Sequence, residues 1–419
     1  MRTAWLLSSI LLIGTASAQG GEINAADNAW VMISAALVLL MIPGVGFFYG
    51  GMVRKKNAIS TIILSFAIMG IISLQWILFG YSLAFGRDIG GIIGGLDFLG
   101  LNGVGMEAKE GLTIPGLTFM IFQAMFAVIT VSLITGSYVE RIKFSSFLVF
   151  SLLWATLVYD PIAHWVWGGG WLAQMGALDF AGGLVVHISA GVSALAIALV
   201  IGARKGFGAD PMEPHNIPTT VMGAALLWFG WFGFNAGSAL AANGLAANAF
   251  VTTNTAAAAA ATTWMLISWR HRAPSALGIV TGAVAGLAAV TPASGFVTPL
   301  AAIPIGIGAG IIVYYAILFV RGGKKVDDSL DVLACHGIGS TWGVLATGIF
   351  ASIGAAGLFY GNPGQLAVQL IAVAATWIYS FAITYALARV IDAFMGLRVR
   401  DEEEAVGLDL SQHGEGAYA

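Results

Sequence analysis

The chain has 419 residues, of which 58% are hydrophobic and only 9% are charged. An ordinary soluble domain carries about 25% charged residues, so this composition excludes a soluble globular protein and is typical of a polytopic membrane protein. The 18 basic and 21 acidic residues give a net charge of -3 and form no basic field, which excludes nucleic acid as a partner.

The first 18 residues have the layout of a secretory signal peptide. Arg2 precedes an apolar run over residues 4–13, and the small residues Ala16, Ser17 and Ala18 form a cleavage site. A first membrane helix is the alternative, but the run is shorter than the about 20 residues that a span needs. We therefore expect cleavage after Ala18, which leaves the mature amino terminus outside the cytoplasm.

Apolar segments separated by charged or Gly/Pro-rich breaks predict an all-α protein with about eleven transmembrane helices. In chain order these spans are 29–50, 59–83, 117–138, 144–159, 181–203, 219–240, 246–269, 276–290, 300–320, 333–353 and 365–391. Residues 160–183 are polar and Gly-rich, so we expect them to fold back at the outer mouth. Residues 400–419 are predicted to form a solvated tail, with a regulatory contact as the alternative.

The distribution of Lys and Arg predicts the orientation, because cytoplasmic loops collect basic residues. Fifteen of them fall in alternate breaks, and only Arg87 and Lys109 fall in the others. The amino terminus is therefore expected outside and the carboxyl terminus inside, which requires an odd number of spans.

A histidine in the fifth span, His187, and another in the tenth, His336, hint at a duplication. Each lies downstream of an aspartate, Asp179 or Asp331, which we expect to cap a helix. The transmembrane domain, residues 19–399, would then hold inverted five-helix halves, about 29–203 and 219–353, and a final helix, about 365–391. Such inverted repeats with a site at mid-membrane recur in transporters.

Ionisable groups inside spans are costly and therefore functional by default. His187 and His336 have apolar or tiny neighbours, and two imidazoles side by side can pass a proton or line a polar path. Packing against backbone carbonyls is the alternative. The sequence lacks a ligand spacing such as His-x-x-x-His, a nucleophile elbow and a phosphate-binding loop, so we predict no metal, no cofactor and no enzyme.

Aromatic side chains that could hold a small cation occur in three segments. Aromatic faces attract cations by about 0.5 to 2 kcal/mol, and a hydroxyl adds an acceptor. Packing or lipid contact is the alternative for each one, since the chain has 24 Phe. The candidates are Phe122 and Phe126 on one helix face, Trp167 before three glycines, and Trp231, Phe234 and Ser238 on the sixth span.

Six motifs carry a resemblance to a known family. They are GGMVR at 50–54, AHWVWGGG at 163–170, ALDFAGG at 177–183, WFGWFGFNAGS at 228–238, DVLACHG at 331–337 and GLDLSQHG at 407–414. Together and in this order they resemble the ammonium transporter family (Amt/Mep/Rh), in particular its bacterial and archaeal Amt type. The resemblance extends over nearly the whole mature chain.

The resemblance implies a homotrimer in the inner (plasma) membrane, surrounded by lipid, with one pore per subunit between the inverted halves. It implies an outer ammonium site of Phe126, Trp167 and Ser238 with Phe122 near it, a gate of Phe126 and Phe234, pore histidines His187 and His336, and supporting Asp179 and Trp231. Ammonium would lose its proton, ammonia would cross, and the histidines would relay the proton, while potassium would be rejected at the gate.

The same resemblance implies a trimeric PII-type nitrogen-regulatory protein as a possible partner on the cytoplasmic face. Two rival functions stay open at this point. One is a neutral ammonia or gas channel, which would share the histidines but does not need a cation-binding aromatic site. The other is an ammonium sensor, which we expect would have to act through a partner because only about twenty residues follow Arg400.

Overall fold

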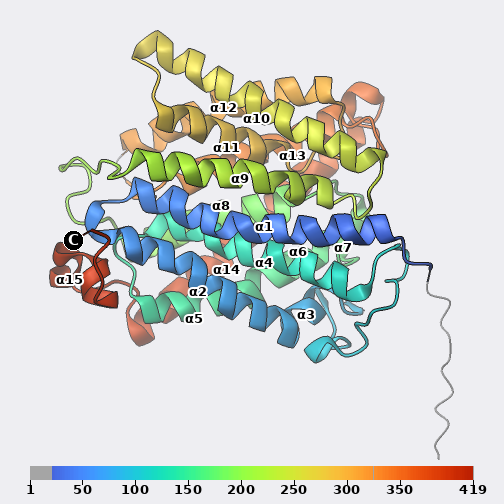
Figure 1. The fold of residues 1–419 in the computed structure, drawn as a ribbon, viewed down its shortest axis with the longest axis horizontal. Coiled ribbons are helices and arrows are strands. Elements are labelled where there is room, and N and C mark those ends of the chain that lie inside the picture. The colour runs from blue at the N-terminus through green and yellow to red at the C-terminus, as the bar shows by residue number, and fades with distance from the viewer. Residues whose placement is uncertain (1–20, 324, 419) are drawn as a thin grey trace, which may run out of the picture.

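The computed structural model describes residues 21–323 and 325–418, so the expected signal peptide over residues 1–18 lies outside the described part. Long helices run along one another and form a single bundle (Figure 1). The uninterrupted ones are α1 Ala25–Met52, α4 Gly116–Tyr138, α9 Ile217–Gly237, α10 Gly244–His271, α11 Ala276–Val290, α12 Pro299–Gly323 and α14 Pro363–Met395.

Four further helices contain a π-helical turn, a rare element that often marks functional sites. These interrupted helices are α2 Ala58–Gln75 with η2 Trp76–Gly80 and α3 Tyr81–Phe85, α5 Phe144–Trp154 with η4 Ala155–Tyr159 and α6 Asp160–Val166, η5 Gly183–Ile188 with α8 Ser189–Ile201, and η6 Leu333–Ile338 with α13 Gly339–Phe350.

Short elements connect these helices. They are η1 Lys55–Asn57, β1 Asp88–Ile89, β2 Ile93–Gly94, η3 Leu99–Leu101, α7 Trp171–Met175, η7 Leu358–Tyr360, α15 Asp401–Val406 and η8 Asp409–His413. The strands β1 and β2 pair antiparallel, with Asp88 opposite Gly94 and Ile89 opposite Ile93.

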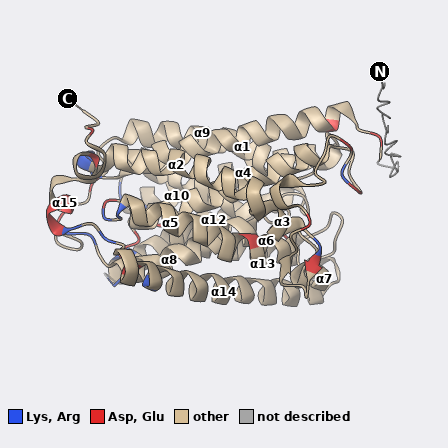
Figure 2. Cartoon of the chain, turned by 90° about the horizontal axis from the view of Figure 1, so that it is seen from below, with Lys and Arg blue, Asp and Glu red and all other residues tan. Residues whose placement is uncertain are grey.

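Within the described residues, nine helices are long and apolar enough to cross a membrane. The α11 helix is shorter, and α10 is not among the nine although it has 28 residues, because Ala, Thr and Asn dominate its sequence. Both pack closely together and against α12. Charged residues gather at the two ends of the bundle and leave its middle nearly free of charge (Figure 2).

One predicted break in the fourth span is wrong. Residues 160–166 were expected to leave the membrane, but they form α6, which continues the helix that begins at Phe144. Asp160 in α6 is fully buried and accepts a 2.7 Å hydrogen bond from the side-chain amide of Gln75. The helix can therefore contain this polar residue, and the chain turns only at Gly168–Gly170.

The C-terminal tail is docked, which makes its interpretation as a solvated segment wrong. The carboxylate of Asp409 accepts the backbone N–H groups of Ile59 and Ser60 at 3.1 and 2.7 Å. It thereby caps the start of α2, where N–H groups lack helical partners. Glu404 is buried and accepts a 2.6 Å bond from Arg398.

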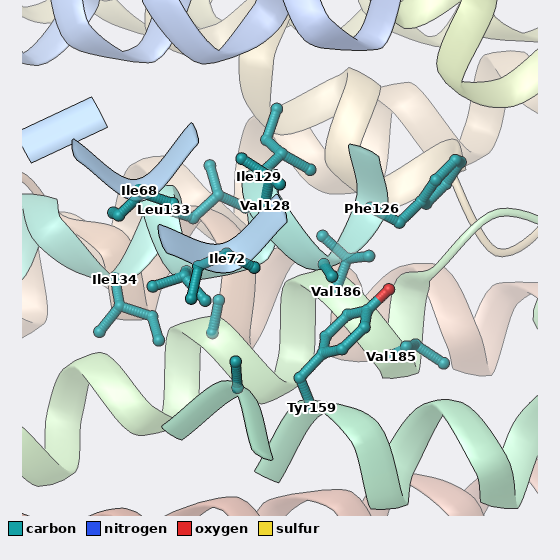
Figure 3. Packing of buried hydrophobic residues seen from close by; sticks show 14 of the residues in the cluster. Ile68, Ile72, Phe126, Val128, Ile129, Leu133, Ile134, Tyr159, Val185 and Val186 are labelled. Carbon is teal, nitrogen blue, oxygen red and sulfur yellow. The ribbon is translucent and has the colours of Figure 1, made fainter. Parts of the chain in front are cut away.

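The two π-containing segments that carry the histidines cross at a pair of glycines. A Cβ atom at Gly191 in α8 would overlap the backbone nitrogen of Gly337 in η6, so the close approach requires a residue without a side chain. The central helix α4 is buried almost throughout, and Figure 3 shows its Val128, Ile129 and Leu133 in the apolar core. This core positions the site described next.

Candidate functional site

An open cavity of about 290 Å³ lies at the end of the bundle opposite the docked tail, where α4, α6 and α9 meet. It contains three of the four predicted binding residues. Its lining is Phe85, Phe119, Gln123, Phe126, Val166, Trp167, Phe180, Ser238 and Leu240. Most of these side chains are apolar, so the few polar atoms define where a ligand could be held.

Trp167 and Ser238 are fixed by the ends of their helices. Trp167 caps the C-terminus of α6, and its indole N–H donates to the carbonyl of Asp179 at 3.0 Å. Its ring stands perpendicular to that of Phe126, with centroids 5.9 Å apart. The Ser238 hydroxyl donates to the carbonyl of Phe234 at 2.8 Å, which leaves its oxygen lone pairs free to accept from a ligand.

Gln123 and Phe119 also line this cavity, and the sequence analysis missed both. Together with Phe126 they follow the spacing i, i+4 and i+7, which places three side chains on one helix face. That spacing is the signal that could have found them. The Gln123 side-chain oxygen is buried and has no hydrogen-bond partner in the described part of the chain, so it offers a second acceptor.

Two phenylalanine rings close the inner end of the cavity. The rings of Phe126 and Phe234 have centroids 4.4 Å apart at an angle of 42°, and both side chains are fully buried. Phe122 packs edge-on against Phe126 at 4.9 Å and does not line the outer cavity. The structure thus places Phe122 behind the constriction, where it supports Phe126.

The two predicted pore histidines lie side by side beyond this constriction. The rings of His187 and His336 are nearly parallel, at 16°, with centroids 5.2 Å apart. His187 also stacks against Phe234 at 5.8 Å and against Trp231 at 5.3 Å. Within the described residues, neither nitrogen of His187 has a hydrogen-bond partner, and Nδ1 of His336 has none.

The histidines face a narrow apolar cavity of about 20 Å³. A cavity needs about 10 to 15 Å³ to hold one water, so this space admits a molecule of that size and little more. Apart from the histidines, its lining is Met41, Val45, Phe48, Tyr49, Ile129, Leu133, Leu227, Trp231, Phe234 and Val284. The indole N–H of Trp231 points elsewhere and donates to Thr291 at 2.9 Å.

Asp179 holds the start of η5, and its predicted role as a helix cap is confirmed. Its carboxylate accepts four backbone N–H groups, those of Gly182, Gly183, Leu184 and Val185, at 2.6 to 3.2 Å. Burial raises the pKa of Asp179 to about 6, although these four donors favour the ionised form. The cap fixes the segment that presents His187 eight residues later.

The matching cap in the second half is Asp328, so the prediction for Asp331 is wrong. Asp328 accepts the backbone N–H of Leu333 at 2.7 Å and precedes His336 by the same eight residues that separate Asp179 from His187. Asp331 instead forms a two-pronged ion pair with Arg321. Asp331 is the aspartate nearer to His336 in sequence, but spacing alone does not reveal which carboxylate faces the helix end.

A buried ionic network lies at the opposite end of the bundle, near the docked tail. Arg204 contacts Glu140 at 2.9 Å and Asp327 at 2.8 Å, and Arg54 contacts Glu140 at 3.0 Å. Burial opposes the ionisation of Glu140, but the two arginines outweigh it and hold the pKa of Glu140 below its usual value. The sequence analysis had used these arginines only to predict the orientation.

Comparison with known proteins gives the family. The family model described as "Ammonium Transporter Family" matches residues 29–418. The chain belongs to this family. It is 58% identical to "Ammonium transporter Amt1" of Archaeoglobus fulgidus over 93% of this chain and 98% of that protein. It is 51% identical to an "Ammonium transporter" of Bacillus subtilis, over 94% and 98%.

Solved structures of the family share this fold. The crystal structure of Candida albicans Mep2 superposes with a TM-score of 0.87 at 38% identity, over 95% of this chain and 91% of that one. A structure titled "Sensor Amt Protein" superposes with a TM-score of 0.87 at 31% identity, over 93% and 98%. This ammonium transporter family member is therefore an all-helical, multi-pass membrane protein of a class of transporters, not of enzymes.

Proposed function

We propose that this chain carries ammonium across the membrane as separated ammonia and proton. Phe126, Trp167 and Ser238 recruit the ammonium ion in the outer cavity, where the ring faces attract its charge and the hydroxyl accepts one of its hydrogens. Phe126 and Phe234 form the gate below, and His187 and His336 receive the proton. Asp179 caps the segment that presents His187 and does not touch the substrate, while Trp231 stacks against His187 and holds its ring in place.

The observation that carries this proposal is the stacked histidine pair beneath a closed aromatic constriction. An ion that enters a narrow, mostly apolar cavity of about 20 Å³ loses nearly all its hydration, which costs far more than the aromatic faces return. Neutral ammonia avoids most of that penalty. The unpartnered ring nitrogens of His187 supply an acceptor for the proton in a lining that is otherwise almost wholly apolar. Potassium has no proton to lose and is rejected there.

We also propose eleven spans with the amino terminus outside and the carboxyl terminus in the cytoplasm, after cleavage of residues 1–18. Adding α10 and α11 to the nine helices that satisfy length and composition gives eleven. Arg54, Arg141 and Arg204 lie with the docked tail at one end, which supports a cytoplasmic location for that end. The same proposal includes a transmembrane domain over residues 19–399, a C-terminal tail over residues 400–419, and the plasma membrane as the location.

The proposed assembly is a homotrimer with one pore per subunit, and the proposed partner is a trimeric PII-type protein at the cytoplasmic face. The support is the motif resemblance together with a broad exposed apolar surface, for example Phe319 and Phe394, which are 83% and 86% exposed in the single chain. Lipid or neighbouring subunits must cover such side chains in the membrane.

The test is a solid-supported-membrane current from purified protein in liposomes, pulsed with ammonium and then with potassium, beside an internal pH dye. The proposal predicts an ammonium-specific current that the double variant H187A/H336A loses. Internal alkalinisation without current would instead establish a neutral ammonia channel. Ammonium binding without current or pH change would favour the sensor function, which the likeness to the "Sensor Amt Protein" keeps as the second candidate.

A further inference from the structure

His164 is a fully buried histidine that the proposed transport mechanism does not use. It lies in α6, three residues before Trp167, and both of its ring nitrogens have partners. Nδ1 lies 2.9 Å from the carbonyl oxygen of Ala84 in α3, and Nε2 lies 2.8 Å from a carboxylate oxygen of Asp88 in β1. The imidazole thereby joins three segments at the end of the bundle that holds the outer cavity.

The two partners of His164 determine which of its ring nitrogens carry a proton. A carbonyl oxygen can only accept, so Nδ1 carries a proton and donates it to Ala84. An ionised carboxylate also only accepts, so the bond to Asp88 requires a second proton on Nε2. The side chain of Asp88 is 37% exposed, and the oxygen that contacts His164 also accepts the N–H of Gly91 at 2.8 Å. The hydrogen bond from His164 lowers the pKa of Asp88. With Asp88 ionised, this geometry requires an imidazolium.

The turn that follows Trp167 is shaped around the bond between His164 and Ala84. A Cβ atom at Gly168 would overlap the carbonyl oxygen of Ala84 and crowd Nδ1 of His164, so the chain can pass here only without a side chain. The backbone carbonyl of His164 accepts the N–H groups of Gly168 and Gly170 at 3.0 and 2.9 Å. The side chain and the backbone of one residue therefore hold both α3 and the glycine turn.

The bonds of His164 lie behind two walls of the outer cavity. Phe85, the residue after Ala84, lines the cavity from the end of α3. Trp167, three residues after His164, lines it from the end of α6. His164 itself does not line the cavity, so it acts on a ligand there only through its neighbours. The bond that joins Ala84 to His164 sets how far apart these two walls stand.

Asp88 is the charged group that faces this imidazole. The elements packed against α6 are α3, η4, α7, β2 and η5, and none of them contains a Lys or Arg. Within the described part of the chain, no other acidic side chain hydrogen-bonds to His164. The remaining titratable residues of these elements, of α6 and of the loop around β1 are Tyr81, Arg87, Asp97, Tyr159, Asp160 and His187.

We propose that the imidazolium of His164 and the carboxylate of Asp88 form a clamp that positions Phe85 and Trp167 for ammonium and opens when the outer face becomes alkaline. His164 is a positioning residue, and this inference rests on the proposed recruitment of ammonium in the outer cavity. Loss of the Nε2 proton leaves a ring lone pair facing a carboxylate oxygen, so an attractive contact becomes a repulsive one. The loop around β1 then separates from α6, and the affinity for ammonium falls while the gate and the pore histidines stay as they are.

The protonation of His164 is tested by nitrogen NMR of the purified full-length protein in liposomes, with isotope-labelled histidine. Of the six histidines, one should show two protonated ring nitrogens at neutral pH. This signal should disappear in D88N, whose amide oxygen still accepts the N–H of Gly91 but carries no charge to hold the proton. The matched control is D97N, because Asp97 accepts an N–H in the same loop, and it should keep the signal. A wild type without an imidazolium signal would overturn the proposal.

The second measurement is the ammonium current in liposomes with the same pH on both sides, and its readout is the half-saturating concentration of ammonium ion. In the wild type this concentration should rise severalfold from slightly acidic to alkaline pH. D88N should show the raised value at every pH with the maximal current of the wild type, and D97N should follow the wild type. A D88N variant with the pH dependence of the wild type, or a D97N variant that behaves like D88N, would overturn the clamp. A wild type without ammonium current would instead refute the proposed function, and the imidazolium signal would still decide whether the clamp exists.

Discussion

Replacing Asp179 by asparagine tests whether one carboxylate holds the segment that presents His187. The aspartate accepts four backbone N–H groups at 2.6 to 3.2 Å, two on each oxygen. In D179N one side-chain atom remains an acceptor, while the other becomes an NH₂ group that faces two N–H donors. The shape of the side chain is conserved, so the effect reports the loss of the charged hydrogen-bond acceptor and not a change in packing.

The magnitude follows from the number of bonds lost. A hydrogen bond to a charged group contributes about 1.5 to 3 kcal/mol, so losing two of them costs about 3 to 6 kcal/mol. The donors left without partners are buried, so water does not replace the carboxylate. We expect a drop of several degrees in the Tm of the purified protein, together with a reduced ammonium current because the start of η5 is displaced.

The Tm is measured by fluorescence-detected unfolding in detergent, and the current is measured in liposomes. The control is D97N, since Asp97 accepts an N–H in an exposed loop and the same substitution there should leave both measurements unchanged. A Tm of D179N equal to that of the wild type would refute the reasoning, because the four bonds would then not stabilise the fold.

Three further predictions concern the gate and the ionic network. F234A should open the constriction and admit a potassium current. The control is F232A, because Phe232 stacks on Phe250 away from the constriction, and this variant should still exclude potassium. An F234A variant that carries no potassium current would rule out the gate. R204M removes the partner that the buried Glu140 and Asp327 share, leaving Glu140 with Arg54 and Asp327 with Arg141 at 4.0 Å, and should lower stability by about 3 kcal/mol. R400M, which changes an exposed arginine, should leave the Tm unchanged, and equal Tm values for the two variants would contradict this prediction. Arg204 and Arg54 depress the pKa of Glu140 despite its burial. The ionised Glu140 therefore contributes its full stabilisation above its usual pKa of about 4.5. This contribution is lost as the pH falls through the lower pKa of the folded state. The Tm of the wild type should therefore fall in acid, and the Tm of E140Q should depend less on pH. If the Tm of E140Q falls in acid as that of the wild type does, the proposed role of Glu140 is wrong.

Hydropathy predicted much of the fold because it acts on whole segments. The runs that became α1, α4, α9 and α14 are long and apolar, and no alternative structure in lipid satisfies their backbones. The histidines were found for a related reason, since His187 and His336 are ionisable groups with no polar neighbours in sequence. Features that depend on the local sequence alone, such as a long apolar run or a histidine within it, can be predicted from the sequence.

The features that the sequence did not reveal depend on contacts between distant segments. Asp160 lies in a helix because Gln75, 85 positions away, donates to it, and Asp409 docks the tail by capping a helix about 350 positions away. The choice between Asp328 and Asp331 depends on Arg321, which claims the second of them. Polarity alone therefore predicted a loop at α6 and a solvated C-terminal tail, whereas distant residues of the folded chain supply the hydrogen-bond partners for both segments.

The placement of charge explains how this fold can treat a cation and its neutral base differently. Fixed charges gather at the ends of the bundle (Figure 2), while the narrow cavity that His187 and His336 line is otherwise almost wholly apolar. Among the described residues that line this cavity, a cation on the proposed path would therefore meet no counter-charge, where the penalty for its desolvation is largest. Two imidazoles 5.2 Å apart can hold a proton in turn while never presenting a permanent charge, which a Lys or Asp at the same place would do. In the mechanism that we propose, a neutral, titratable pair thus admits a proton by relay and still excludes a hydrated metal cation.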